Sequence, residues 1–199
     1  VSAVQDGSVV MIGGFGDAGS PTELIHAVVD RGVSELTVIS NNAGNGLVGL
    51  AALLNAGAVR KVICSYPRSS HSVVFEELYR SGRIELETVP QGTLAERIRA
   101  AGAGIGGFYT KTSVGTPVAK GKETRIIDEE EFVFEAPLKA DVALVKAQTA
   151  DRWGNLGFRL TARNFGPIMC MAAAHTIVQV RRIVPLGAID PESVVTPGI

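Results

Sequence analysis

The sequence has few residues of the kinds that crosslink a small protein or hold a metal ion. It contains only two cysteines, Cys64 and Cys170, and three histidines in 199 residues. Two cysteines cannot build a scaffold of several disulfide bridges, and both lie in apolar surroundings, as expected in a reducing compartment. The histidines, His26, His71 and His175, have no acid or cysteine at the spacing of a zinc site or a catalytic triad. We therefore expect a cytoplasmic protein without a metal.

Long apolar runs and an excess of one charge are also missing. No segment approaches the roughly 18 to 20 consecutive apolar residues that cross a bilayer, because glycine or a charged residue interrupts every run. Nineteen basic and twenty acidic residues leave a formal charge of -1, which argues against binding to nucleic acid or to a membrane surface. Glycine is abundant, with 23 residues in a chain that is 46% hydrophobic. This composition predicts one globular domain over residues 1–199.

The two ends of the sequence carry no sign of a natural start or stop. The chain begins at Val1 instead of methionine and stops at Ile199, directly after Pro197 and Gly198. We expect residues to be missing at both ends, so targeting signals cannot be judged from this sequence.

Short β-branched runs alternate with amphipathic segments through the first half of the chain. Ser20 with Glu23, and Thr93 with Glu96, have the spacing of a capping box at a helix start. Gly32, Gly57 and Gly82 are placed to end three of the helices. The expected strands are 9–12, 36–40, 59–66 and 84–89, and the expected helices are 21–31, 47–56, 73–81 and 94–101. Apolar strands alternating with helices predict an α/β fold, a mostly parallel sheet with helices on both faces.

The pattern changes after Gly102. A glycine-rich loop leads into a small hairpin insertion near residues 121–135, with strands around 125–127 and 132–134. Four acids in succession, Asp128 to Glu131, predict a solvated turn, because the acids of a cation-binding loop are spaced around the turn. Buried strands at 142–146 and 176–180, with a helix at 168–174 between them, are expected to rejoin the main sheet. We therefore expect no second domain and no internal repeat.

The segment GGFGDAGSP, residues 13–21, carries the most chemical information. Gly14, Gly16 and Gly19 match the G-x-G-x-x-G pattern of dinucleotide-binding folds. The acid that would hold a ribose about 20 residues later is missing, since the second strand ends in Ser40 and Asn41. The segment instead favours a glycine-lined turn that brings an anionic ligand to bare backbone at a helix start. A tight turn that binds nothing is the alternative.

These residues resemble the glycine-rich signature of the α subunit of family I CoA-transferases. The resemblance extends to SNNAGNGLVGLAALL (40–54), VPQGTLAERIRAAGAGIGGFYT (89–110), GKETR (121–125), ADRWGNL (150–156) and ARNFGPIM (162–169). It therefore covers nearly the whole chain and implies the α-subunit fold of that family. The NNAGNG, KETR and DRWGN segments are most similar to those of 3-oxoadipate CoA-transferase α subunits.

The resemblance implies that this chain is one half of an enzyme. In the family, an acyl-CoA is attacked by a glutamate of the β subunit, which forms an acyl anhydride and then a glutamyl-CoA thioester in a ping-pong route. The S-E-N-G type segment that carries this glutamate is absent here. The resemblance thus implies a β-subunit partner, an α2β2 assembly, and CoA thioesters as substrates with no permanently bound cofactor.

The reaction implied is the transfer of CoA from succinyl-CoA to a 3-oxo acid. The first acceptor to consider is 3-oxoadipate, as in the breakdown of aromatic compounds. Acetoacetate or another short-chain acid is the alternative acceptor, and a non-catalytic module that binds CoA esters is an alternative of a different class. A dehydrogenase comes third.

The resemblance also implies the site residues. Gln91, before Gly92 in P-Q-G-T, matches a family position near the acyl group, and its side-chain amide is suited to stabilise an oxyanion. Since Gln91, Asn41 and Asn42 follow strands of one parallel sheet, we expect them in a single crevice at its carboxyl edge. Asparagines that bond only their own backbone are the alternative. The residues expected to bind CoA or the acyl group are Gly13, Gly14, Phe15, Gly16, Asp17, Ala18, Gly19, Asn41, Asn42 and Gly92.

Two other features stay open at this point. A dicarboxylate substrate needs a cation or several donors at its distal carboxylate, and Arg68, Lys111 and Arg163 are candidates for that role. Trp153 and Asn164 lie in predicted loops, where they contact the partner or simply pack within the chain.

Overall fold

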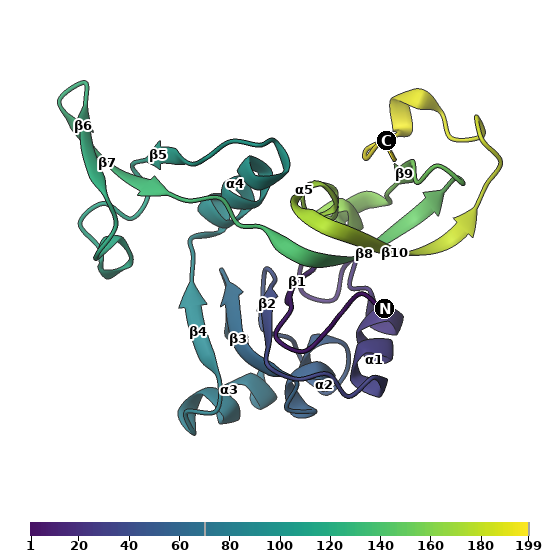
Figure 1. The fold of residues 1–199 in the computed structure, drawn as a ribbon, viewed down its shortest axis with the longest axis horizontal. Helices are drawn as coiled ribbons and strands as arrows, with labels where there is room; N and C mark the ends of the chain where they lie inside the picture. The colour runs from purple at the N-terminus through teal and green to yellow at the C-terminus, as the bar shows by residue number, and fades with distance from the viewer. Residues whose placement is uncertain (70, 199) are drawn as a thin grey trace.

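The main sheet of the computed structural model, which describes residues 1–69 and 71–198, is almost entirely parallel. Its strands follow the order β10-β8-β1-β2-β3-β4, and β9 pairs antiparallel with β8. The second half of the chain thus rejoins the first, and the predicted α/β fold is confirmed (Figure 1). The strands are β1 (Val9–Ile12), β2 (Leu36–Ile39), β3 (Val59–Cys64), β4 (Glu85–Thr88), β8 (Ala140–Ala150), β9 (Leu156–Gly157) and β10 (Ala173–Ile183).

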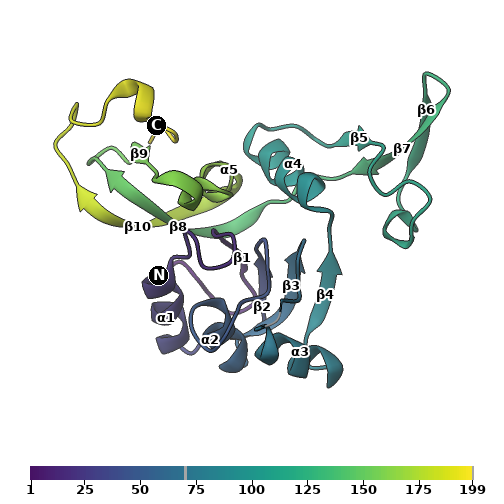
Figure 2. The same cartoon turned by 180° about the vertical axis from the view of Figure 1, so that it is seen from behind.

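Helices cover both faces of this sheet, as predicted. One face holds α1 (Thr22–Asp30), α2 (Leu50–Asn55) and α3 (Val73–Arg80), and the other holds α4 (Gln91–Gly102) and α5 (Gly166–Ala172) (Figures 1 and 2). Successive residues of a strand point to opposite faces. Val10 and Ile12 therefore join the core under α1, while Met11 joins the core under α4. This two-sided burial explains why the strands are apolar throughout. In the described residues, no helix is long and apolar enough to cross a membrane.

The predicted capping box at Thr93 is wrong. The helix α4 begins two residues earlier, at Gln91, directly after Pro90. Thr93 is therefore inside the helix and only 4% exposed, so its side chain packs into the core instead of capping the helix. Glu96, free of a capping role, pairs with Arg99 at 2.7 Å between Oε1 and Nη2.

The start of α1 also lacks the predicted cap, because Pro21 occupies the N-cap position without a side-chain hydrogen bond. The second helix is shorter than predicted, since Leu47 and Val48 lie exposed in the loop before it. The predicted ends are confirmed at Gly57 and Gly82, which have φ angles of +72° and +69°. Glycine adopts this left-handed conformation at no steric cost. The helix expected at 168–174 runs from 166 to 172, and its two flanking strands are longer than predicted.

A separate antiparallel sheet of three strands carries the predicted hairpin. It consists of β5 (Phe108–Thr110), β6 (Thr124–Ile127) and β7 (Glu130–Glu135), in the order β5-β7-β6. The four acids lie around its turn, as predicted, and Asp128 and Glu129 both have positive φ angles there. The third strand, β5, was not predicted, because glycines precede it and the run is only three residues long. Figure 1 shows this sheet standing apart from the main one.

Glu135 links the small sheet to the rest of the chain through buried charge. Its side chain is 1% exposed and contacts Lys122 at 2.5 Å and Arg97 of α4 at 3.7 Å. Removing one partner of a buried ion pair leaves uncompensated charge behind. We expect Glu135→Ala to lower the free energy of unfolding by about 3 kcal/mol in a urea titration. The exposed pair of Glu130 with Lys111 provides the control, since Glu130→Ala should cost less than about 1 kcal/mol. Equal losses would contradict this account.

Candidate functional site

The segment from Gly13 to Gly19, here called the glycine loop, connects β1 to α1 at the carboxyl edge of the sheet. Phe15 and Ala18 bond to each other across it, with N···O distances of 3.0 and 3.2 Å. Gly16, at the tip of this turn, has a φ of +58°. At Gly19 a Cβ atom would lie 2.6 Å from the Ala162 carbonyl oxygen. The loop therefore needs Gly16 for its turn and Gly19 for close contact with a later segment.

Most of the backbone amides of the glycine loop are engaged within the protein. Gly13 donates to the Leu144 carbonyl at 3.0 Å, and Gly14 donates to Asn164 Oδ1 at 3.1 Å. Among the described residues, no acceptor pairs with the N–H of Gly16 or of Asp17. Both residues line a pocket, so the loop presents two free backbone donors at its surface.

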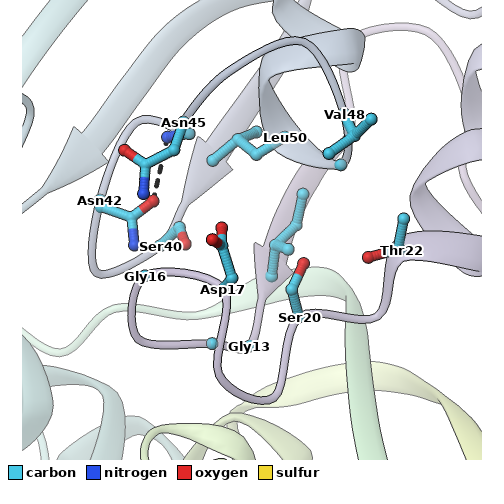
Figure 3. Close-up of a pocket in the computed structure, with 14 residues that line it drawn as sticks. Gly13, Gly16, Asp17, Ser20, Thr22, Ser40, Asn42, Asn45, Val48 and Leu50 are labelled. Atoms are coloured by element: carbon cyan, nitrogen blue, oxygen red, sulfur yellow. Dashed lines mark hydrogen bonds between the residues drawn. The ribbon is translucent and has the colours of Figure 1, made fainter. Parts of the chain in front are cut away.

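Three adjoining pockets surround this loop. The inner pocket lies between the glycine loop and the segment after β2, and Figure 3 shows Asp17 and Ser20 facing Asn42 and Asn45 across it. The amide pocket, of about 280 Å³, is lined by Phe15, Gly16, Asn41, Asn42, Asn45, Tyr66, Ser69 and Gln91. The arginine pocket is lined by Phe15, Ala18, Leu160, Thr161, Arg163 and Asn164. Phe15, half exposed, is shared by the amide and arginine pockets and separates them.

The structure brings Gln91, Asn41 and Asn42 into the same amide pocket. Gln91 Nε2 donates to Asn41 Oδ1 at 2.7 Å, and Ser65 Oγ donates to the same oxygen at 2.8 Å. Asn41 is only 2% exposed, so its oxygen is a fixed anchor for the exposed Gln91 side chain. A side-chain amide has two hydrogens, which leaves Gln91 one donor for a ligand.

The other predicted residues are placed differently. Asn42 Oδ1 accepts from the Gly44 amide at 2.9 Å, which is the local backbone bond considered as the alternative for this residue. Its side chain still lines both the inner and the amide pockets. Gly92 lies in the first turn of α4, outside the three pocket linings. The remaining predicted binding residues all belong to the glycine loop, which the three pockets surround.

The described residues that line these pockets include one acid, Asp17, and one base, Arg163, and no glutamate or cysteine. The helix glutamates are engaged elsewhere, as Glu76 pairs with Arg68 at 2.7 Å and with Arg80 at 3.0 Å. Within the described part of the chain, the site thus offers hydrogen-bond donors but no carboxylate nucleophile apart from Asp17.

The two thiols are unsuited to nucleophilic chemistry. Cys64, in β3, is fully buried, and desolvation raises the pKa of its thiol to about 12. Burial likewise raises the pKa of Cys170 to about 11. A thiolate is the reactive form of cysteine, and both groups stay protonated well above neutral pH. No group of three or more histidine, cysteine, aspartate or glutamate side chains in the described residues could hold a metal ion.

The three candidate cations have different surroundings. Arg68 is bound to Glu76, and Lys111 is bound to Glu130 on the small sheet. Arg163 lies in the arginine pocket, next to Phe15 of the glycine loop, and forms no ion pair with any described residue. Arg163 is therefore the free cation of the three.

The sequence left the role of Asn164 open, and the structure turns this residue toward the glycine loop. Its Oδ1 accepts from Gly14, and its Nδ2 donates to the Ala18 carbonyl at 2.9 Å. Trp153, by contrast, is half exposed in the loop before β9. Asparagine commonly bonds backbone groups, but the sequence gives no signal that the partner lies 150 residues away.

A sequence profile of the coenzyme A transferase family matches residues 1–199. The chain belongs to this coenzyme A transferase family. It is 62% identical over 199 residues to the α subunit of 3-oxoadipate CoA-transferase from Pseudomonas putida, covering all of this chain and 86% of that protein. It is 55% identical over 196 residues to the α subunit of succinyl-CoA:3-ketoacid coenzyme A transferase from Xanthomonas campestris pv. campestris (strain B100), covering 98% of this chain and 80% of that protein. The family resemblance seen in the sequence is confirmed.

Solved structures of coenzyme A transferases have the same fold. Glutaconate coenzyme A-transferase from Acidaminococcus fermentans superposes with a TM-score of 0.84 at 21% identity, over 99% of this chain and 69% of that chain. An acyl-CoA transferase from Escherichia coli O157:H7, in a thioester complex with CoA, gives a TM-score of 0.84 at 22% identity. The present chain spans 44% of that longer chain. At these identities the likeness concerns the fold of this coenzyme A transferase chain.

Proposed function

We propose that this chain is the α subunit of a CoA-transferase that moves CoA from succinyl-CoA to 3-oxoadipate. The 62% identity to the corresponding subunit of a 3-oxoadipate CoA-transferase over the full chain is the observation that carries the proposal. The site supports it in a second way. Its pockets hold amide donors and a free arginine, but the described lining residues include no glutamate. A partner subunit that supplies the nucleophile completes such a site.

The reaction needs an oxyanion to be stabilised in each step. The partner's glutamate carboxylate attacks the thioester carbonyl of succinyl-CoA, and the C–S bond breaks to give an anhydride and the CoA thiolate. The thiolate then attacks the glutamyl carbonyl of the anhydride and releases succinate, leaving a glutamyl-CoA thioester. The acceptor carboxylate repeats both steps in reverse, so no oxidant or proton is consumed. Donors already fixed in position stabilise the charge at each tetrahedral stage.

This chain supplies the donors. Gln91, held by its bond to Asn41, directs its second N–H into the amide pocket as an oxyanion donor. The N–H groups of Gly16 and Asp17 contact the CoA ester along the glycine loop. Arg163, on the other side of Phe15, binds the distal carboxylate of the dicarboxylic acyl group. The substrate therefore lies across Phe15, with its reacting carbonyl in the amide pocket.

The alternative acceptor is acetoacetate, because the relative from Xanthomonas campestris is named for 3-ketoacids. Acetoacetate lacks the distal carboxylate of 3-oxoadipate, so the two acids differ in their need for Arg163. We expect Arg163→Ala to raise the KM for 3-oxoadipate by about 10- to 100-fold, the usual value of a hydrogen bond to a charged group. The KM for acetoacetate, measured at saturating succinyl-CoA, should stay within about twofold of its unmodified value, because no contact to this acid is lost.

The control for this comparison is Arg68→Ala, which removes a cation already paired with Glu76. Its effect on both acids should be small. Equal increases in KM for the two acids in Arg163→Ala would contradict a carboxylate-binding role for Arg163. Turnover of acetoacetate alone by the unmodified enzyme would keep the transferase and change its substrate.

A further inference from the structure

We propose that Asn164 is a positioning residue that holds the glycine loop in the shape needed to bind a CoA ester. The inference rests on the proposed function, because it assigns that loop to the substrate. Asn164 lies in the turn between the short 3-10 helix at 160–163 and α5, where it lines the arginine pocket and not the amide pocket.

Four hydrogen bonds fix the Asn164 side chain. Oδ1 accepts from the amides of Gly14 at 3.1 Å and Phe165 at 2.7 Å. Nδ2 donates to the carbonyls of Ala18 at 2.9 Å and Thr161 at 2.7 Å. The amide therefore uses both its acceptor and its donor side, and each side has one bond to the glycine loop and one to its own segment. This pattern links two segments that are about 150 residues apart.

The two loop bonds lie on both sides of the turn at Gly16. Gly14 comes before the turn and Ala18 after it, and Ala18 also accepts from the Phe15 amide. Holding both sides fixes where the free N–H groups of Gly16 and Asp17 point. The close contact at Gly19, where no Cβ fits against the Ala162 carbonyl, presses the loop onto the same segment. Asn164 thus sets the position of donors that it does not itself form.

The first experiment measures loop order directly, by hydrogen exchange of the 13–19 region in the assembled enzyme. Asn164→Ala removes both loop bonds and leaves the Gly14 amide without an acceptor, so exchange in this region should become faster. The matched control is Asn155→Ala, another loop asparagine whose side chain donates one bond and accepts one, to Asp151 and from Gly198. It should leave exchange at residues 13–19 unchanged. Unchanged exchange in Asn164→Ala would overturn the proposal.

The second experiment tests the consequence for binding. Asn164→Ala should lower kcat/KM for succinyl-CoA by about 10- to 100-fold, mainly through KM, since a misplaced loop weakens substrate contacts. Faster exchange without a change in the KM for succinyl-CoA would overturn the role in binding. A lack of transferase activity in the unmodified enzyme would instead reject the proposed function, and the exchange result would still stand by itself.

The third experiment uses Asn164→Asp, which keeps the shape and the acceptor but replaces the donor. A carboxylate oxygen would then face the Ala18 and Thr161 carbonyls, and this repulsion raises the pKa of the new carboxyl above its usual value of about 3.9. Protonation at lower pH restores a donor. The kcat/KM of this variant relative to the unmodified enzyme should therefore rise as the pH falls from about 8 to about 5. A ratio independent of pH would contradict donation to Ala18, and the control Asn155→Asp should show no such trend.

Discussion

Replacing Gln91 by alanine is expected to lower kcat by about 10- to 1,000-fold in the assembled enzyme. The side-chain amide, anchored at 2.7 Å to Asn41 Oδ1, provides a donor whose position is set before the substrate arrives. Such a donor stabilises the oxyanion more than the ground-state carbonyl, so its loss appears in kcat more than in KM. Steady-state kinetics with succinyl-CoA and 3-oxoadipate measure both constants.

The control for Gln91 is another exposed glutamine far from the pockets. The side chain of Gln5 bonds only the nearby Ser2 carbonyl, so Gln5→Ala should leave kcat unchanged. A second variant, Asn41→Ala, removes the anchor and keeps the donor, and should lower kcat by less than Gln91→Ala does. An unchanged kcat in Gln91→Ala would remove Gln91 from the mechanism.

The second large effect is expected for Gly16→Val, which should weaken CoA-ester binding by on the order of tenfold or more without preventing association with the partner. Gly16 has a φ of +58°, and a β-branched residue is strongly disfavoured there. A Cβ at this position meets no atom within 4 Å. The valine therefore causes no clash within the chain, but it changes the backbone that carries the free donors and narrows the two pockets that Gly16 lines.

Gly57→Val is the matched control. Gly57 has a φ of +72° and open space around its Cβ position, but it ends α2 and lines none of the three pockets. The two variants should lose similar amounts of stability, on the order of 1 to 3 kcal/mol, and only Gly16→Val should lose CoA-ester affinity in a titration. Equal affinity in both variants would show that the glycine loop is only a turn.

The fold could be predicted from the sequence because its strands and helices have clear periods. Buried parallel strands are apolar on both faces, so even four residues such as Val9 to Ile12 give a strong signal. The helix starts were predicted less well. Thr93 has the spacing of a capping residue, yet α4 begins directly after Pro90, and Thr93 becomes a buried helix residue. Local spacing cannot show which of two competing start signals tertiary packing selects.

The site was predictable where its residues follow strands in the chain. Gln91 and Asn41 come after strands of one parallel sheet, so topology alone places them at one edge of the sheet. The bond that joins them, and the use of Asn164 to hold the glycine loop, depend on side-chain geometry across distant segments. The choice of Arg163 over Arg68 depends on which cation already has an acidic partner, which the sequence does not reveal.

The measurement that tests the central claim most directly is the formation of 3-oxoadipyl-CoA from succinyl-CoA and 3-oxoadipate. It compares this chain by itself, its β-subunit partner by itself and the two mixed. The account predicts product only in the mixture, because this chain provides the donors and the partner provides the glutamate. Product from this chain by itself would contradict the split site. No product with any acceptor acid, together with CoA-ester binding by this chain, would make it a binding module instead of half of a transferase.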